Sequence, residues 1–314
     1  MGGRRVGRII ATAIARTAFA AVLFCLVPAV PAQDPAVFRS DVHLVRLEVT
    51  VKDSNGGITT GLTKDDFEVS ESGVPQQIAI FERNTSLPLS IAVLVDTSGS
   101  TYKDLGYEIE STNRFFRAVT REGNPDDAVA LYSFNWQVTQ YAGFGRNTAR
   151  LERALHTLRG DGGTSLYDAI YLASRDIEDR EGRHAMIVVT DGGDTTSTKD
   201  FDAALEAAQR AEAVLYPIVV VPIENPAGRN IGGEHALETI AARTGGRPFF
   251  PSDSGSLDQA FDEILQELRT QYLLAYYPHG VPGGRDRFHP VAVKVRRADL
   301  RAVTRSGYYG ESSP

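Results

Sequence analysis

The fold of this chain is decided by the stretch Ile91-Ala92-Val93-Leu94-Val95-Asp96-Thr97-Ser98-Gly99-Ser100. Its unbroken apolar run is typical of a strand that is buried on both faces, as in a parallel sheet. The run ends at a carboxylate, and two serine hydroxyls follow on either side of a glycine that permits a tight turn. Parallel sheets bind ligands at the carboxyl ends of their strands, so this position is a candidate site.

Two further apolar runs match the first. Residues 185–189 lead into Thr190-Asp191, and residues 215–221 form the other run. Between these runs, apolar residues recur at helical spacing within 105–119, 151–158, 170–177, 201–208, 237–241 and 261–268. Alternating strands and helices predict an α/β fold with a doubly wound, mostly parallel sheet and helices on both faces. We place this domain at residues 87–270.

The two flanks have a different pattern. Apolar and polar residues alternate from Val45 to Lys52 and again from Val291 to Arg296, which is the period of a half-buried strand. We expect an N-terminal β region at 33–86 and a C-terminal β region at 271–314 to pair as one small β-sandwich-like domain. Residues 300–309 are predicted as a single strand, and Tyr272, Tyr276 and Tyr277 as sandwich packing.

The N-terminus has the pattern of an export signal. Basic residues precede an apolar run from Phe19 to Val27, and small residues follow up to Ala32. These features predict a secretory signal peptide over residues 1–32. A transmembrane anchor is the alternative, but the apolar run is too short to span a bilayer. A twin-arginine signal at Arg4-Arg5 fits its flanking residues poorly. We therefore expect a periplasmic, cell-surface or secreted protein without a membrane span after cleavage.

Composition narrows the function classes. The 314 residues carry a formal net charge of -7 and are 42% hydrophobic, as in a folded soluble protein. The acidic balance argues against nucleic acid as the main partner. The one cysteine is Cys25, within the predicted signal peptide, which excludes a disulfide scaffold and a cysteine-rich zinc site.

Oxygen-bearing side chains gather at the predicted strand ends. Asp96, Ser98 and Ser100 follow one strand, Thr164 lies in a glycine-rich loop, and Asp191 follows another strand. Oxygen ligands without His or Cys suit a hard cation such as Mg²⁺, with Mn²⁺ or Ca²⁺ as alternatives. We assign the three hydroxyls as direct ligands and the two carboxylates as ligands through water. Neutral direct ligands leave the ion electrophilic, so a protein partner is expected to supply a carboxylate.

This constellation resembles the von Willebrand factor type A (VWA) domain family. The metal-ion-dependent adhesion site of that family has the pattern Asp-x-Ser-x-Ser, then Thr, then Asp, which Asp96, Ser98, Ser100, Thr164 and Asp191 match in order. The resemblance covers about residues 87–270. The flanks look like exported bacterial "VWFA-related" proteins through residues 61–67 and 272–276. The resemblance implies the fold, a divalent metal and a protein-binding role, but no particular partner.

Simpler interpretations compete at single positions. Asp96 and Ser98 are common helix-capping residues, although capping does not explain all five residues. Asp253-Ser254-Gly255-Ser256 looks like a second copy of the motif, but it lacks the spacing and is predicted to be a loop and cap. The charge run from Glu178 to Arg183 is interpreted as a solvated helix end.

Three classes of function follow. The first is an exported, metal-dependent adhesion or protein-interaction protein. The alternative is a metal-independent structural or assembly subunit of an envelope complex. An enzyme is not expected, because the chain has no Gly-x-Ser-x-Gly elbow, Walker loop or Gly-x-Gly-x-x-Gly after a strand. We assign no catalytic residue, and the sequence predicts neither the partner nor the oligomeric state.

Overall fold

A computed structural model describes residues 44–83, 87–99, 105–220, 230–281 and 287–310. The predicted signal peptide (residues 1–32) and Ser100 lie outside the described residues. Within the described ranges, no helix is long and apolar enough to cross a membrane. All of these residues belong to one compact unit, Val42–Pro314.

A five-stranded sheet with the order β7-β6-β5-β8-β9 forms the centre of the α/β domain. Four of these strands run parallel and are buried along their whole length: β5 (Leu89–Asp96), β6 (Ala128–Phe134), β8 (Arg183–Thr190) and β9 (Ala213–Val219). The edge strand β7 (Val138–Gly145) pairs antiparallel with β6. Burial on both faces explains why the strands are continuous apolar runs.

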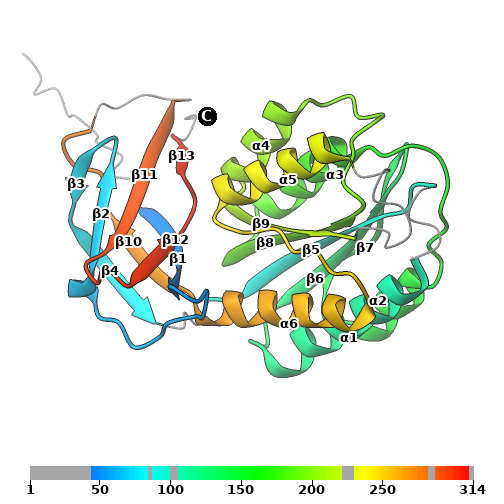
Figure 1. Cartoon of the computed structure of the whole chain (residues 1–314), viewed down its shortest axis with the longest axis horizontal. Coiled ribbons are helices and arrows are strands. Elements are labelled where there is room, and N and C mark those ends of the chain that lie inside the picture. Colours follow the sequence, from blue (N-terminus) through cyan, green and yellow to red (C-terminus); the bar gives the residue numbers. More distant parts are fainter. Residues whose placement is uncertain (1–43, 84–86, 100–104, 221–229, 282–286, 311–314) are drawn as a thin grey trace, which may run out of the picture. The chain divides into compact units, whose positions relative to one another are not determined.

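Helices cover both faces of this sheet (Figure 1). One face packs against α1 (Leu105–Glu122), α2 (Thr148–Leu155) and α6 (Ser254–Thr270). The other packs against α3 (Leu166–Glu178), α4 (Phe201–Arg210) and α5 (Ile231–Thr244). Successive side chains of β5 alternate between the two cores, with Val93 in one and Leu94 in the other. The predicted doubly wound fold is confirmed.

Strands β6 and β7 were not predicted from the sequence. The short apolar part of β6 is followed by Tyr132 and Ser133, which interrupt the pattern of a buried strand. Tyr132 is nevertheless buried, because its hydroxyl donates to Asp176 Oδ2 at 2.8 Å and accepts from Gln140 Nε2 at 2.7 Å. These partners lie on α3 and β7, so only the folded structure brings them to the tyrosine.

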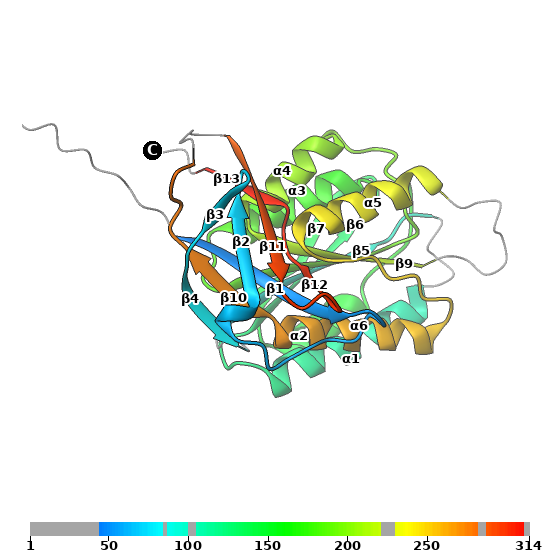
Figure 2. The same cartoon turned by 60° about the vertical axis from the view of Figure 1, so that its left-hand side comes forward.

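Both flanks contribute to two packed four-stranded sheets. One sheet has the order β12-β1-β10-β4, formed by Leu300–Val303, Val45–Asp53, Tyr272–Tyr276 and Ile78–Arg83. The other has the order β13-β11-β2-β3, formed by Gly307–Tyr309, Phe288–Val295, Phe67–Glu71 and Val74–Gln76. A short 3-10 helix, Lys64–Asp66, precedes β2. Each sheet therefore mixes strands from both ends of the described chain, as Figure 2 shows.

Residues 300–309 form two strands rather than the predicted single one. The link between β12 and β13 forms hydrogen bonds both with β1 of the sandwich and with the α/β domain. Arg305 Nη2 donates to the Arg46 carbonyl at 2.7 Å and to Glu212 Oε1 at 3.0 Å, and the Ser306 amide donates to the Arg243 carbonyl at 2.9 Å. These hydrogen bonds hold the link that separates β12 in one sheet from β13 in the other.

Two of the three tyrosines pack in the sandwich core as expected. Tyr272 and Tyr276 are buried, and the Tyr276 hydroxyl donates to the buried Glu71 carboxylate at 2.8 Å. His289 Nδ1 lies 2.8 Å from the other Glu71 oxygen, so this carboxylate is satisfied inside the core. Tyr277 is half exposed, so the prediction of packing was wrong for that residue.

The interpretation of 178–183 as a solvated helix end is wrong at Arg183. This residue opens β8 and is buried, and its guanidinium donates to the Leu268 carbonyl near the end of α6. Burial lowers the pKa of Arg183. The Arg183 guanidinium therefore hydrogen-bonds to a backbone carbonyl of a distant helix, whereas the sequence pattern had suggested contact with solvent.

Truncation after Gln271 tests how far the sandwich depends on both chain ends. The change removes β10, which lies between β1 and β4, so both remaining strands lose their pairing. We expect residues 44–83 to become protease-sensitive, measured by limited proteolysis with mass spectrometry. A matched truncation after Gly310 leaves every described strand and should retain resistance. If residues 44–83 stay protease-resistant in the variant truncated after Gln271, the N-terminal strands do not depend on the C-terminal ones.

Candidate functional site

Asp96 ends the central strand β5, and its carboxylate is fully buried. Its Oδ1 accepts the Ser98 amide at 2.8 Å, and its Oδ2 accepts the Thr190 hydroxyl at 2.6 Å. Thr190 ends the neighbouring strand β8, so this contact joins two strands at their carboxyl ends. Burial raises the pKa of Asp96 to about 6, partly offset by these hydrogen bonds and supported by the nearby Asp191 charge.

The glycine-rich loop that carries Thr164 is held against the segment after β5. The Asp161 amide donates to the Thr97 carbonyl at 2.8 Å, and the Gly99 amide donates to the Gly162 carbonyl at 3.1 Å. Gly162 has a φ of +75°, and a Cβ there would lie 2.4 Å from Trp136 Cδ1. Trp136 is 60% exposed, so an indole ring lies on this loop at the molecular surface.

The third segment, which carries Asp191, is tied to both of the others. Thr190 contacts Asp96 as described, and its hydroxyl oxygen also accepts the Gly192 amide at 3.1 Å. Farther along, the Thr195 amide donates to the Thr164 carbonyl at 2.8 Å, and the Thr164 amide donates to the Thr195 hydroxyl at 2.8 Å. The structure therefore brings the Asp96, Thr164 and Asp191 segments together at one end of the sheet.

The remaining oxygen groups of these segments fit a hard cation. In the described part of the chain, neither the Thr164 hydroxyl nor the Asp191 carboxylate makes a hydrogen bond. Each Asp96 oxygen already accepts one hydrogen bond, which suits a carboxylate that orients other groups. No group of three His, Cys, Asp or Glu side chains suited to a metal occurs among the described residues.

Helix capping does not account for the Asp96 motif but does account for its apparent copy. Asp96 belongs to β5, and its carboxylate bonds to the end of another strand. Asp253, by contrast, is the N-cap of α6, and its Oδ1 accepts the Ser256 amide at 2.7 Å. The predicted cap is confirmed at Asp253, whereas residues 254–256 form the first turn of α6 rather than a loop.

Sequence reasoning missed the role of Thr190, Thr195 and the start of α5. Thr190 lies at a strand end directly before a candidate ligand, and that position could have identified it. Gly233 in the first turn of α5 packs on the Asp191 loop so closely that a Cβ would lie 1.3 Å from the Gly192 carbonyl oxygen. Nothing in the sequence indicates that this helix supports the site.

The family model of the von Willebrand factor type A domain matches residues 90–263 of the chain. The chain belongs to the von Willebrand factor type A domain family. Domains of this family mediate protein–protein interactions and are generally non-enzymatic modules. The match spans β5 to α6 and thus contains all the segments of the candidate site.

A solved VWA structure shares the fold at low sequence identity, and two further solved structures are similar to the chain. A von Willebrand factor type A protein from Catenulispora acidiphila has a TM-score of 0.50 and 12% identity, covering 88% of this chain and 76% of its own. The vWF domain of the type V pili tip protein Mfa5 from Porphyromonas gingivalis has a TM-score of 0.49 and 14% identity, covering 58% and 95%. The pilus adhesin SpaC from Lactobacillus rhamnosus GG, in its open conformation, has a TM-score of 0.49 and 10% identity, covering 78% and 47%. No curated protein sequence matches the chain.

Gly233→Ala tests the support that α5 gives to the VWA site. A methyl group at this position collides with the Gly192 backbone, so we expect a loss of about 1–3 kcal/mol in unfolding free energy. Gly232→Ala is the matched control, because its Cβ meets only Asn230 Oδ1 at 3.6 Å. Alanine favours the helix, so this control should be neutral or slightly stabilising. Equal stability of the two variants by urea unfolding would contradict the close packing.

The raised pKa of Asp96 predicts a pH dependence of the metal-free domain. The ordinary aspartate pKa is 3.8 and that of buried Asp96 is about 6, so between these values the native state binds more protons than the unfolded chain. The Asp96 contribution to the unfolding free energy therefore falls as pH rises from about 4 to about 6, by on the order of 3 kcal/mol. Urea unfolding in EDTA across this range measures the change. Asp96→Asn should remove it, and an unchanged pH slope in that variant would exclude Asp96 as its source.

Proposed function

We propose that this chain is an exported protein whose VWA domain binds a protein partner through a divalent cation. Ser98, Ser100 and Thr164 are the direct hydroxyl ligands in this proposal, and Asp96 and Asp191 bind through water. Mg²⁺ is the preferred ion for such oxygen ligands, with Mn²⁺ and Ca²⁺ as alternatives. A carboxylate of the partner completes the coordination.

One observation carries the proposal: the segments that bear these residues are hydrogen-bonded to one another at the carboxyl ends of β5 and β8. The Thr190 hydroxyl donates to Asp96, the Thr164 amide donates to the Thr195 hydroxyl, and the Gly99 amide donates to the Gly162 carbonyl. A preformed arrangement lowers the cost of ordering the ligands when an ion binds. The fully buried Asp96 also favours a nearby cation, which would offset the cost of burying its negative charge.

The chemistry of the ligands supports a carboxylate partner. Hydroxyl ligands are neutral, so an ion bound by them keeps most of its charge. The two carboxylates are assigned to water-mediated positions, which leaves a direct position for an external anionic oxygen. A protein that supplies an aspartate or glutamate side chain fits this requirement, and a family of protein-interaction domains is consistent with it.

Export is supported by the N-terminal sequence. The basic start, the apolar run and the small residues before position 32 form the pattern of a secretory signal. Expression of the full chain, followed by N-terminal sequencing of the product outside the cytoplasm, identifies any cleavage site directly.

A magnesium titration monitored by tryptophan fluorescence tests the metal site. Trp136 is the one tryptophan of the chain and lies on Gly162, two positions before Thr164. We expect saturable fluorescence changes in the wild type and a rise in melting temperature of roughly 5–10 °C at 100 times the dissociation constant. Ser98→Ala and Thr164→Ala should abolish both effects.

Ser254→Ala is the control for this titration, because Ser254 belongs to the motif copy that begins α6. It should respond to magnesium as the wild type does. A wild type that responds to none of Mg²⁺, Mn²⁺ and Ca²⁺ would contradict a metal-dependent function. An unchanged response in Ser98→Ala would show that the ion binds at another site.

A further inference from the structure

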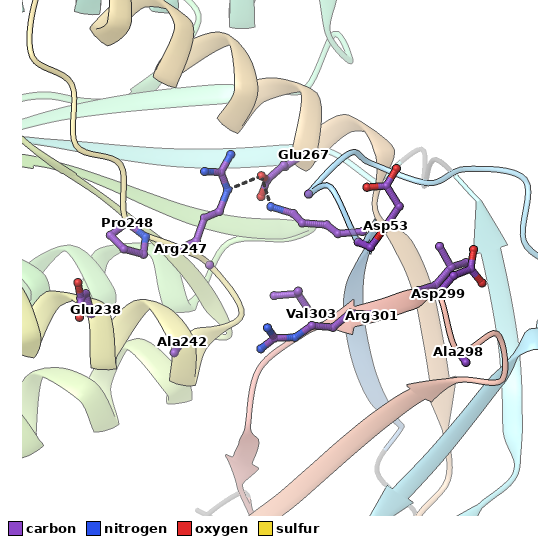
Figure 3. A pocket seen from close by; sticks show the side chains of 15 residues that line it. Asp53, Glu238, Ala242, Arg247, Pro248, Glu267, Ala298, Asp299, Arg301 and Val303 are labelled. Atoms are coloured by element: carbon purple, nitrogen blue, oxygen red, sulfur yellow. Dashed lines mark hydrogen bonds and ion pairs between the residues drawn. The ribbon is translucent and has the colours of Figure 1, made fainter.

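A cavity of about 620 Å³ lies between the edge strand β12 and the loop from α5 to α6, away from the VWA site. Figure 3 shows this cavity, with β12 and the end of β1 on one side and α5 and α6 on the other. Its size is typical of a small-molecule site. Its apolar walls are formed by Ala242, Pro248, Ala298, Leu300 and Val303.

Two cations in this cavity are already neutralised. Lys52 Nζ and Arg247 Nε each donate to Glu267 Oε1 at 2.7 Å, and Arg247 Nη2 donates to Glu263 Oε2 at 2.6 Å. Glu267 is buried, and the Arg247 guanidinium also lies over the Phe249 ring at 3.9 Å from its centroid. These contacts fix one wall of the cavity in a single arrangement.

Arg301 differs from these two cations. Its guanidinium extends from β12 across the cavity toward Ala242 on α5 (Figure 3), and within the described ranges it makes no hydrogen bond or ion pair. A guanidinium has a planar fork of donors that matches the two oxygens of a carboxylate. The cavity thus combines apolar walls with one unengaged, directional cation.

We propose that this cavity binds a small organic carboxylate, with the carboxylate on Arg301 and an apolar body against Ala242, Pro248, Leu300 and Val303. A monoanion fits better than a dianion such as phosphate. Four carboxylates, Asp53, Glu238, Glu267 and Asp299, also line the cavity, so a second negative charge on the ligand would be repelled. Lys52 and Arg247 are paired with Glu267 and Glu263, which leaves Arg301 as the one lining cation without an ion pair among the described residues. The ligand is thereby defined by one negative charge and a short apolar chain or ring.

Ligand-observed NMR on the full chain tests this site with benzoate and hexanoate as probes. Benzamide and hexanamide are their neutral counterparts, and inorganic phosphate is the dianionic probe. EDTA is present throughout, so the result does not depend on the proposed metal site. We expect the carboxylates to bind, their amides and phosphate to bind at least about tenfold more weakly, and Arg301→Gln to weaken carboxylate binding by a similar factor.

Two arginine variants serve as controls. Arg296→Gln removes an exposed arginine of the preceding turn that pairs with Glu68 at 3.3 Å and does not line the cavity. Arg175→Gln alters a second, larger cleft of about 920 Å³ that also contains Arg46, Arg180 and Arg210. Both variants should bind the carboxylates like the wild type, and a thermal melt of each variant checks that it is folded.

Four results would overturn the proposal. Equal binding of carboxylates and amides would show that the cavity does not select charge, and tighter binding of phosphate would show a dianion site. Loss of binding in Arg175→Gln but not in Arg301→Gln would place the probe in the other cleft. Absence of carboxylate binding to the folded wild type at millimolar concentrations would exclude the site.

Discussion

The hydrogen bonds of the buried Asp96 carboxylate constrain the candidate site more than any other interaction. Asp96 is the last residue of the central strand β5, and every side chain of this strand is buried. Burial without partners would be costly, so both oxygens are occupied, one by the Ser98 amide and one by the Thr190 hydroxyl. The first bond shapes the turn after β5, and the second fixes the neighbouring end of β8. Further hydrogen bonds, from the Gly99 amide to the Gly162 carbonyl and from the Thr164 amide to the Thr195 hydroxyl, hold the Thr164 loop beside these strand ends.

A network of small residues extends this constraint outward. Gly162 allows Trp136 to lie on the Thr164 loop, and Gly233 allows α5 to contact the Gly192 backbone. A side chain at either glycine would separate elements that the site requires to be adjacent. The three segments of the candidate site are thus held together by close backbone approach as well as by hydrogen bonds.

The β-sandwich is connected to the VWA domain by side-chain contacts as well as by the polypeptide chain. Its strand β10 begins directly after α6 and Gln271, and it pairs with β1 and β4 from the N-terminal flank. Arg305 and Lys52 then reach the α/β domain through Glu212 and Glu267. The cavity at Arg301 exists because these contacts hold an edge strand beside the loop from α5 to α6. Its lining comes from parts of the chain far apart in sequence.

The sequence alone determined the α/β fold, the β-sandwich formed by both flanks, and the grouping of Asp96, Ser98, Thr164 and Asp191. Each of these rests on local patterns, because buried parallel strands are apolar throughout and polar groups at their ends fall on one edge. Only the tertiary structure decided the strand at Tyr132, the burial of Arg183, the break at Arg305 and the contact of Gly233. In those cases a polar group or a glycine has its partner on a distant element, and no local pattern encodes which partner that is.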